Sequence, residues 1–367
     1  MNRLILIGNG FDLAHGLKTS YVDFVNWYWE EWGRRLAGSS HKFEEDDFCS
    51  FAMNEQIGLD GWYLVRGYYF RNINLDVKEF VKRAKNDTDL CEFRYKSPFL
   101  EQINKQIESK RWVDVENEYY ELLTQDLRVR SVNKIVPSAK ELNIHLGFLR
   151  EKLIEYLKLQ NEKEITLRKD IDDKIYRPIK EEETDVANNI ILPDFGLEPS
   201  NIMLLNFNYT STPELYMGGH SNVTINYIHG RLDEPNSVIF GYGDELDKEF
   251  SRLKELNDNE YLRYVKSINY LEADNYRRLL EFIESEPFQI VIMGHSCGNP
   301  DRTLLNTLFE HQNCISIKPY YYINDQQEDN YLEIVQNIYR NFTNLQQMRA
   351  RVVNKAYTEA LTNPIKQ

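Results

Sequence analysis

Hydrophobic residues along the chain gather in five short runs that predict β-strands. The runs cover residues 3–7, 202–206, 224–228, 289–293 and 315–323, and residues 238–240 would add a shorter strand. The first, second and fourth runs are uninterrupted, which is typical of parallel strands that are covered on both faces. We therefore expect a mostly parallel sheet whose strands come from both ends of the chain.

Most of the remaining sequence has helical spacing of its apolar residues. Ser20 and Asp23 have the spacing of a capping box, which predicts a helix that begins there. Two further helices are predicted by apolar residues at Trp112, Val115, Tyr119, Leu122 and Leu123, and at Leu142, Leu146, Leu149, Leu153 and Leu157. Residues 161–183 are mostly charged, and we expect a solvated helix or a flexible excursion there.

These elements predict an α/β fold, a doubly wound and mostly parallel sheet with large helical insertions. The sheet domain would be discontinuous and comprise residues 1–21, 200–245 and 287–350. Residues 22–199 would form a helical lobe, and residues 246–286 a second helical insertion. In such a sheet, ligands bind in the crevice at the carboxyl ends of the strands.

Composition and charge narrow the function classes. The chain of 367 residues is 42% hydrophobic and carries a net charge of −14. Because phosphate neutralisation drives nucleic-acid binding, this acidity makes nucleic acid an unlikely partner. The four cysteines lie far apart with no CxxC pair, so we expect free thiols and no metal site. No signal peptide or membrane-spanning run is evident, which predicts a cytoplasmic protein.

The first predicted strand runs into a glycine turn, Gly8-Asn9-Gly10-Phe11-Asp12, with His15 shortly after it. Glycines let a backbone approach a phosphate closely and expose its N–H groups. The spacing differs from both G-x-G-x-x-G and the P-loop, so a plain structural turn is an equal alternative. Asp12 and His15 would be ligand contacts or simple loop caps.

Polar residues also follow the second and third strands. Asn206 and Asn208 stand at alternate positions, where an amide can hold a ribose hydroxyl or a water; an Asx turn is the structural alternative. His229 follows the third strand and precedes Gly230. A histidine there is well placed as a general base, and a structural loop histidine is the alternative.

The fourth strand ends in Gly294-His295-Ser296-Cys297-Gly298, followed by Pro300 and Asp301. G-x-S-x-G after a strand is the outline of the nucleophile elbow of a serine hydrolase. His311 is the only histidine after Ser296, and it comes too early for the usual base of that fold. Pro300 also stands where the helix after the elbow should be well formed.

Taken together, the motifs GNGFDLAHGLKTSYVDF, WVDVE, LNFNYTSTPELY, NYIHG and MGHSCGNPD resemble the AbiH family of bacteriophage abortive-infection proteins. The motifs span residues 3–301, most of the chain. The resemblance implies a role in defence against phage.

The order of motifs is also similar, at greater distance, to sirtuin-like NAD-binding domains with a Rossmann-like core. In that comparison Gly8 and Gly10 match the first loop, Asn208 and His229 match the catalytic pair, and Gly294 and Ser296 match the last loop. Thr210 departs from the usual Asp, and the first loop from the G-A-G-x-S type. The missing zinc module excludes deacetylation.

The sirtuin-like resemblance implies that the chain binds NAD and cleaves it to ADP-ribose and nicotinamide. Asn208 and His229 would then be catalytic. NAD would be held by Gly8, Asn9, Gly10, Phe11, Asp12, His15, Gly294, Ser296 and Asp301, with the last two on the adenosine side. We expect a resting protein that is held inactive, with the lobe 22–199 as its gate or sensor.

Two other functions stay open. One is a nucleotide sensor that binds without cleaving. The other is an RNA-targeting toxin, for which Arg35 and His41 have a suitable spacing. A phage-derived trigger and a second copy of the chain are further candidate partners.

Overall fold

The computed structural model describes the chain except for residues 39–42, 55–90, 111–113, 130–136, 185–191 and 363–367. The chain divides into two compact units. The first contains residues 1–19 and 157–367, and the second contains residues 20–156. The lobe expected over residues 22–199 thus overlaps the second unit, while its described residues from 157 onward belong to the first.

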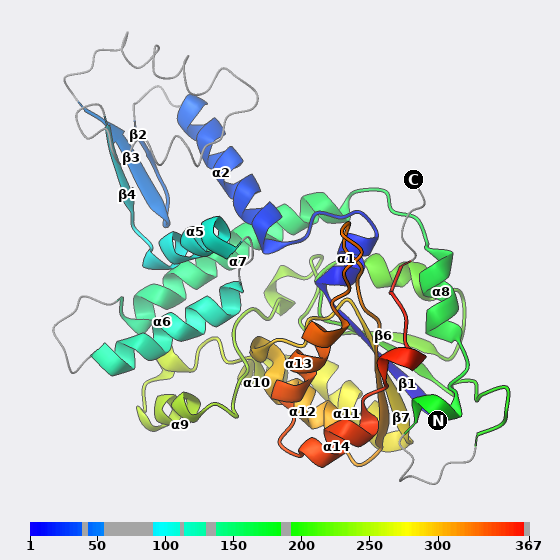
Figure 1. Cartoon of the computed structure of the whole chain (residues 1–367). Coiled ribbons are helices and arrows are strands. Elements are labelled where there is room, and N and C mark those ends of the chain that lie inside the picture. The colour runs from blue at the N-terminus through cyan, green and yellow to red at the C-terminus, as the bar shows by residue number, and fades with distance from the viewer. Residues whose placement is uncertain (39–42, 55–90, 111–113, 130–136, 185–191, 363–367) are drawn as a thin grey trace. The chain divides into compact units, whose positions relative to one another are not determined.

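A five-stranded parallel sheet forms the centre of the first unit (Figure 1). Its strands lie in the order β6-β5-β1-β7-β8. They are β1 (Asn2–Ile7), β5 (Ile202–Asn206), β6 (Val223–Tyr227), β7 (Phe288–Met293) and β8 (Cys314–Pro319). All four pairings are parallel. The predicted α/β fold with a parallel sheet is confirmed.

The strand order places a switch point beside β1. From β1 the chain adds β5 and then β6 on one side, and β7 and then β8 on the other. The loops after β1 and β7 therefore leave neighbouring strands in opposite directions. In open parallel sheets a crevice for ligands lies at such a point, at the carboxyl ends of the strands.

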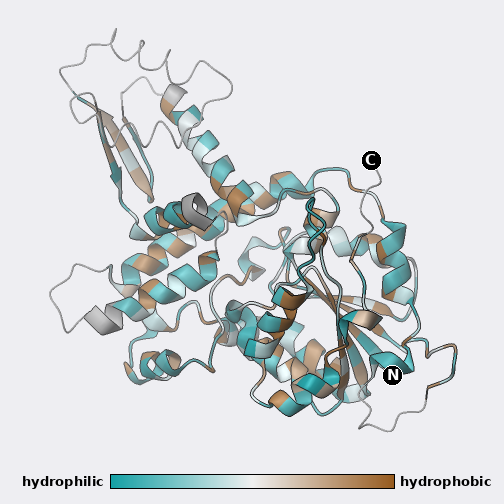
Figure 2. Ribbon diagram, in the orientation of Figure 1, coloured by the Kyte–Doolittle hydropathy of each residue, from teal (hydrophilic) through white to brown (hydrophobic). Residues whose placement is uncertain are grey.

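Helices cover both faces of this sheet. On one face lie α1 (Asn9–Ala14), α8 (Lys169–Tyr176) and the 3₁₀ helix η3 (Thr212–Tyr216), packed on Ile5, Ile7 and Leu204. On the other lie α11 (Asn275–Ser285), α12 (Arg302–Phe309), α13 (Tyr331–Asn341) and α14 (Leu345–Arg351), packed on Leu4 and Leu6. The strands are largely brown in Figure 2, because both of their faces are apolar.

Two local predictions are wrong. Residues 238–240 form no strand; Val238 and Phe240 are buried in an irregular segment. The charged segment 161–183 is also less solvated than expected. It contains α8, whose Ile171 and Ile175 are fully buried against the sheet. Two apolar residues four positions apart were enough to attach an otherwise charged helix.

Between β6 and β7 lie several short helices. They are α9 (Lys248–Glu255), η5 (Asn259–Tyr261), α10 (Lys266–Asn269) and η6 (Tyr270–Glu272), followed by α11. Leu279 and Ile283 of α11 belong to the core of the sheet. The end of the segment expected to be an insertion therefore covers the sheet.

The second unit combines helices with a small antiparallel sheet. Its helices are α2 (Tyr21–Gly38), α5 (Pro98–Lys110), α6 (Val115–Val129) and most of α7 (Ala139–Asn161). The sheet comprises β2 (Phe43–Glu45), β3 (Cys49–Met53) and β4 (Cys91–Tyr95). The capping box is confirmed, since the Asp23 N–H donates to Ser20 Oγ at 3.1 Å. Trp112 lies outside the described residues.

Candidate functional site

The carboxyl ends of β1, β5 and β7 carry loops that contact one another. The Gly10 N–H donates to the Gly294 carbonyl at 2.9 Å. The Asn208 Nδ2 atom donates to the Gly8 carbonyl, also at 2.9 Å. The structure thus brings together three of the four predicted strand-end motifs through direct hydrogen bonds.

Close packing explains the glycines in these loops. A Cβ atom on Gly8 would lie 2.5 Å from the Cα of His295, and one on Gly294 would lie 2.2 Å from the Phe11 nitrogen. Gly294 also has a φ of +76°, a region that favours glycine. The glycines therefore let the first and last loops touch.

The N–H groups expected to bind the NAD pyrophosphate have partners within the protein. Those of Gly8 and Gly10 donate to the carbonyls of Met293 and Gly294, at 3.3 and 2.9 Å. The Phe11 N–H donates to the Gly8 carbonyl at 2.9 Å. Phosphate binding here would require these bonds to be exchanged, so this role stays a prediction.

Asp12 is the buried acid of the first loop. Its side chain is 1% exposed, and its Oδ2 accepts a hydrogen bond from the Thr210 hydroxyl at 2.7 Å. Its Oδ1 has no hydrogen-bond partner among the described residues. Burial raises the pKa of this carboxyl to about 6. Thr210, the departure from the sirtuin-like pattern, therefore serves as the partner of Asp12.

The other predicted contacts of the first loop have structural surroundings. Both ring nitrogens of His15 are engaged at 2.7 Å, Nδ1 with the Phe11 carbonyl and Nε2 with the Tyr216 hydroxyl. The Phe11 ring is fully buried in the core. Asn9 is exposed, and its Oδ1 accepts from the Thr19 hydroxyl. No ligand role is needed to explain these three side chains.

A cluster of ionisable side chains lies at the ends of β6 and β7. The Nε2 atom of His229 is 3.3 Å from Oδ1 of Asp301, and Nζ of Lys266 is 2.8 Å from the same oxygen. The Nε2 atom of His295 is 3.4 Å from Oδ2. The side chains of Lys266, His229 and His295 are 1, 4 and 5% exposed. Asp301 is thus the centre of a nearly buried cluster.

The charges in this cluster determine the tautomer of His229. Burial alone would raise the pKa of Asp301, but the charge of Lys266 and hydrogen bonds from His229 and His295 hold it well below its usual value. An ionised carboxylate only accepts hydrogen bonds, so it favours a proton on the Nε2 atom that faces it. Neutral His229 then has its lone pair on Nδ1, which no described residue hydrogen-bonds.

Aromatic rings enclose the His229 imidazole. The Tyr270 ring is stacked with it at a centroid distance of 6.1 Å, and the Tyr270 hydroxyl lies 3.2 Å from Nε2. The Phe207 ring contacts both His229 and His295 edge-on or tilted, at 5.2 and 4.1 Å. The candidate base is therefore held by packing as well as by charge.

Sequence reasoning missed Lys266 and Tyr270 and gave His295 no role. His295 stands inside a quoted motif and follows a buried strand, so its position was a usable signal. Lys266 and Tyr270 lie in α10 and η6, within a segment expected to be a separate helical insertion. Their spacing in the sequence carries no signal that they meet His229 and Asp301.

The serine hydrolase alternative requires a strained serine that is hydrogen-bonded to a histidine, and the loop after β7 does not have this arrangement. Ser296 is exposed, and no described histidine hydrogen-bonds its hydroxyl. The positive φ angles of this loop belong to Gly294 and Cys297 rather than to the serine. His295 is turned away, with Nδ1 accepting from the Cys297 N–H and Nε2 toward Asp301.

The toxin alternative depends on Arg35 and His41. Arg35 is bound in ion pairs with Glu44 and Asp46, at 2.7 and 2.8 Å. His41 lies outside the described residues.

No group of three or more His, Cys, Asp or Glu side chains among the described residues has an arrangement that would hold a metal ion. None of the helices in that part of the chain is both long and apolar enough to cross a bilayer.

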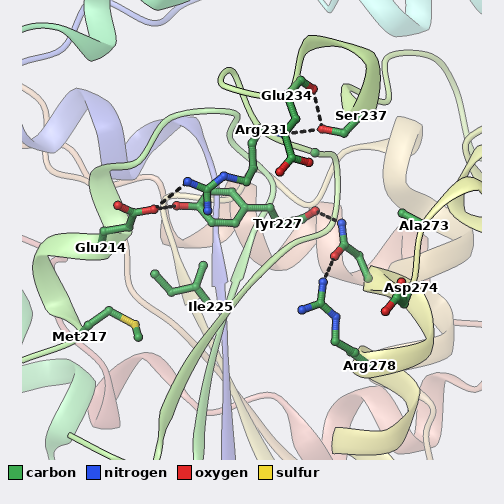
Figure 3. A pocket seen from close by; sticks show the side chains of 12 residues that line it. Glu214, Met217, Ile225, Tyr227, Arg231, Glu234, Ser237, Ala273, Asp274 and Arg278 are labelled. Atoms are coloured by element: carbon green, nitrogen blue, oxygen red, sulfur yellow. Dashed lines mark hydrogen bonds and ion pairs between the residues drawn. The ribbon is translucent and has the colours of Figure 1, made fainter. Parts of the chain in front are cut away.

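A cavity of about 700 Å³ lies beside the edge strand β6 (Figure 3). Its lining includes Tyr227, Gly230 and Arg231 but neither His229 nor Asn208. It is therefore adjacent to the ionisable cluster in the sequence and distinct from it.

Comparison with known proteins gives one match. The family model described as bacteriophage abortive infection AbiH matches residues 4–323. No curated protein and no solved structure matches the chain. The matched span includes every strand-end motif described above. The chain therefore belongs to the AbiH family of bacteriophage abortive-infection proteins.

Proposed function

We propose that this protein hydrolyses NAD when infection triggers it, with His229 as the general base. The observation that carries the proposal is the contact between His229 and Asp301. An imidazole whose Nε2 faces an ionised, nearly buried carboxylate has a fixed orientation and a basic Nδ1. The sirtuin-like relation that suggested NAD stays a prediction.

The reaction asks little of the protein besides positioning and proton removal. A water oxygen bonds to C1 of the nicotinamide ribose as the bond from C1 to the nicotinamide nitrogen breaks. The bonding electrons neutralise the pyridinium, so the leaving group needs no acid. The water proton passes to Nδ1 of His229. Such base assistance accelerates a reaction by about 10²–10⁴-fold.

In this proposal Asn208 orients the ribose or the water. Its Nδ2 is committed to the Gly8 carbonyl at 2.9 Å, and its backbone N–H to Asn206 Oδ1 at 3.1 Å. The amide is thereby fixed, which leaves its Oδ1 as the acceptor for a ribose hydroxyl.

Asp301 acts in this account as a positioning residue. Sequence comparison assigned it to the adenosine side, but its carboxylate contacts His229, His295 and Lys266. Its role is to fix the His229 tautomer and to stabilise the imidazolium that forms. We expect Asp301→Asn to lower kcat much more than it raises KM.

The burial of His229 supports a resting state that is closed to substrate. Tyr270 and Lys266, which cover the cluster, come from η6 and α10, outside the lobe expected over 22–199. Activation would then require movement of residues 266–270. The gating role of the lobe stays a prediction.

The direct test is to incubate the purified full chain with NAD in an extract of phage-infected cells, which supplies the trigger, and to follow products by mass spectrometry. We compare wild type with His229→Ala and, as a matched control, His311→Ala. His311 precedes β8 and therefore lies at the opposite end of the sheet. ADP-ribose and nicotinamide should form with wild type and His311→Ala, and about 10²–10⁴-fold more slowly with His229→Ala.

Equal rates for the two alanine variants would refute the assignment of His229. Intact NAD bound to the wild-type protein, with no products even in extract of infected cells, would favour the sensor that binds without cleaving.

A further inference from the structure

The strand β6 has an open edge. Ile202 donates to the Asn222 carbonyl at 2.9 Å and Ile228 donates to the Asn206 carbonyl at 3.1 Å, which fixes how β6 pairs with β5. Alternate residues of a strand bond to the same neighbour. The backbone groups of Ile225 and Tyr227 therefore face away from β5.

Part of this edge is without partners. The Tyr227 carbonyl accepts from Asn275 Nδ2 at 2.8 Å and from the Gly230 N–H at 3.0 Å. The N–H and carbonyl of Ile225 and the N–H of Tyr227 have no hydrogen-bond partner among the described residues. Such a row of outward donors and acceptors is a template for another strand.

The cavity of about 700 Å³ lies along this edge. Ile225 and Tyr227 of β6 line it, with Glu214 from η3 to one side and Asp274 and Arg278 from the start of α11 to the other (Figure 3). The edge groups therefore lie at the base of a groove bordered by elements from opposite faces of the sheet.

The groove has an excess of unpaired negative charge. Arg231 lies over the Tyr227 ring at 4.4 Å and is already paired with Glu214 and Asp233, at 3.2 and 2.8 Å. Glu234, Asp274 and Arg278 also line the cavity, and none of the three has an ion-pair partner in the described part of the chain, so unpaired carboxylates outnumber unpaired cations by one. A lysine or arginine side chain would complement these two carboxylates.

We propose that this edge groove, lined by β6, η3 and the start of α11, binds an extended segment of a partner protein as an added strand. The backbone of the segment bonds to Ile225 and Tyr227, and one basic side chain reaches Glu234 and Asp274. The groove includes Gly230, which directly follows His229. The bound strand thus contacts the residue next to the candidate base.

The probe is a library of eight-residue peptides with one fixed lysine among alternating valine and threonine, measured against the full chain by fluorescence polarisation. Ile225→Pro removes the outward N–H, and proline is tolerated at such an edge position. Ile225→Ala keeps the N–H and is the matched control. Binding should be about tenfold weaker for the proline variant than for the alanine variant.

Backbone N-methylation of the best peptide gives a test that does not require a folded variant. Only alternate N–H groups of an added strand face β6. Methylation at alternate positions should therefore abolish binding, and methylation at the positions between them should not. Equal effects at consecutive positions, or no peptide bound at about 1 mM, would overturn the proposal.

The double variant Glu234→Gln with Asp274→Asn tests the contribution of charge. It should weaken the binding of lysine peptides about tenfold and leave the binding of their alanine counterparts unchanged. Glu272→Gln, an exposed carboxylate outside the lining, is the control. His229→Ala should bind the peptides like wild type, so failure of the NAD proposal leaves this one standing.

Discussion

The Nζ atom of Lys266 lies 2.8 Å from Oδ1 of Asp301, and the lysine side chain is only 1% exposed. Two segments that are 35 positions apart thus meet as opposite charges in a nearly dry environment. Each charge is tolerated there because the other is present. The same carboxylate faces His229, so the ion pair supports the candidate site.

Breaking this pair should cost far more than breaking one at the surface. We expect Lys266→Met and Asp301→Asn each to lower the free energy of unfolding by about 3–5 kcal/mol, because each leaves a buried charge alone. The double variant should lose less free energy of unfolding than the two single variants lose in total. Urea unfolding measures all three.

The control for this prediction is Lys355→Met, which breaks the surface pair between Lys355 Nζ and Asp329 Oδ2 at 2.6 Å. The free energy of unfolding of Lys355→Met should fall by less than about 1 kcal/mol. Similar losses at the buried and the surface pair would contradict the account of the cluster.

Two glycines with similar backbone angles provide a test of the loop contact. Gly294 and Gly16 have φ of +76° and +81°, so alanine is strained at both. Only Gly294 would also bring its Cβ within 2.2 Å of the Phe11 nitrogen, whereas Gly16 faces open space. Gly16→Ala should lower the free energy of unfolding, measured in urea, by about 1–2 kcal/mol. Gly294→Ala should lower it by clearly more. Equal costs would mean that the loops do not need their close contact.

Asp12 should make stability depend on pH. Burial raises its pKa from 3.8 to about 6, so between these pH values the folded chain binds more protons than the unfolded chain. Its contribution to the free energy of unfolding is therefore highest in acid and falls as the pH rises toward 6. Asp12→Asn should be more stable than wild type by up to about 3 kcal/mol at neutral pH.

The difference between Asp12→Asn and wild type isolates this carboxyl from the other groups that titrate. It should shrink as the pH is lowered from about 7.5 to about 4.5. Urea unfolding across that range measures it. A difference that is constant with pH would show that Asp12 has an ordinary pKa in the folded chain.

His15 should matter for stability and not for NAD. Both of its ring nitrogens hold structural partners, the Phe11 carbonyl and the Tyr216 hydroxyl. His15→Ala should lower the free energy of unfolding by about 1–3 kcal/mol, since Tyr216 loses a bond in a partly buried place. The KM for NAD of the folded variant should stay within about twofold of wild type. A large rise in KM with unchanged stability would restore His15 as a ligand contact.

The sequence predicted the sheet well and the site in part. A short uninterrupted apolar run such as residues 202–206 is typical of a strand that is covered on both faces. The observed β5 matches that run. The last strand, expected over 315–323, ends at Pro319, because the aromatic residues after it also suit irregular structure. Gly8, Asn208 and Gly294 were expected to meet because the carboxyl ends of parallel strands converge, and their loops do contact one another.

The surroundings of His229 were beyond the sequence. Lys266 and Tyr270 reach it from short helices whose apolar pattern indicates only packing. The glycine N–H groups of the first loop were expected to be free for phosphate, yet that of Gly8 donates to the Met293 carbonyl and that of Gly10 to the Gly294 carbonyl. Partners of this kind are set by the folded loops, and no local pattern encodes them.

The most direct test of the central claim is cellular NAD, measured by mass spectrometry during phage infection. Cells carry wild type, His229→Ala, Asn208→Ala or the His311→Ala control at equal protein levels. The account predicts a collapse of NAD with a rise of ADP-ribose and nicotinamide for wild type and His311→Ala only. Unchanged NAD in wild-type cells that still resist the phage would contradict it, and RNA integrity in the same samples would then be examined.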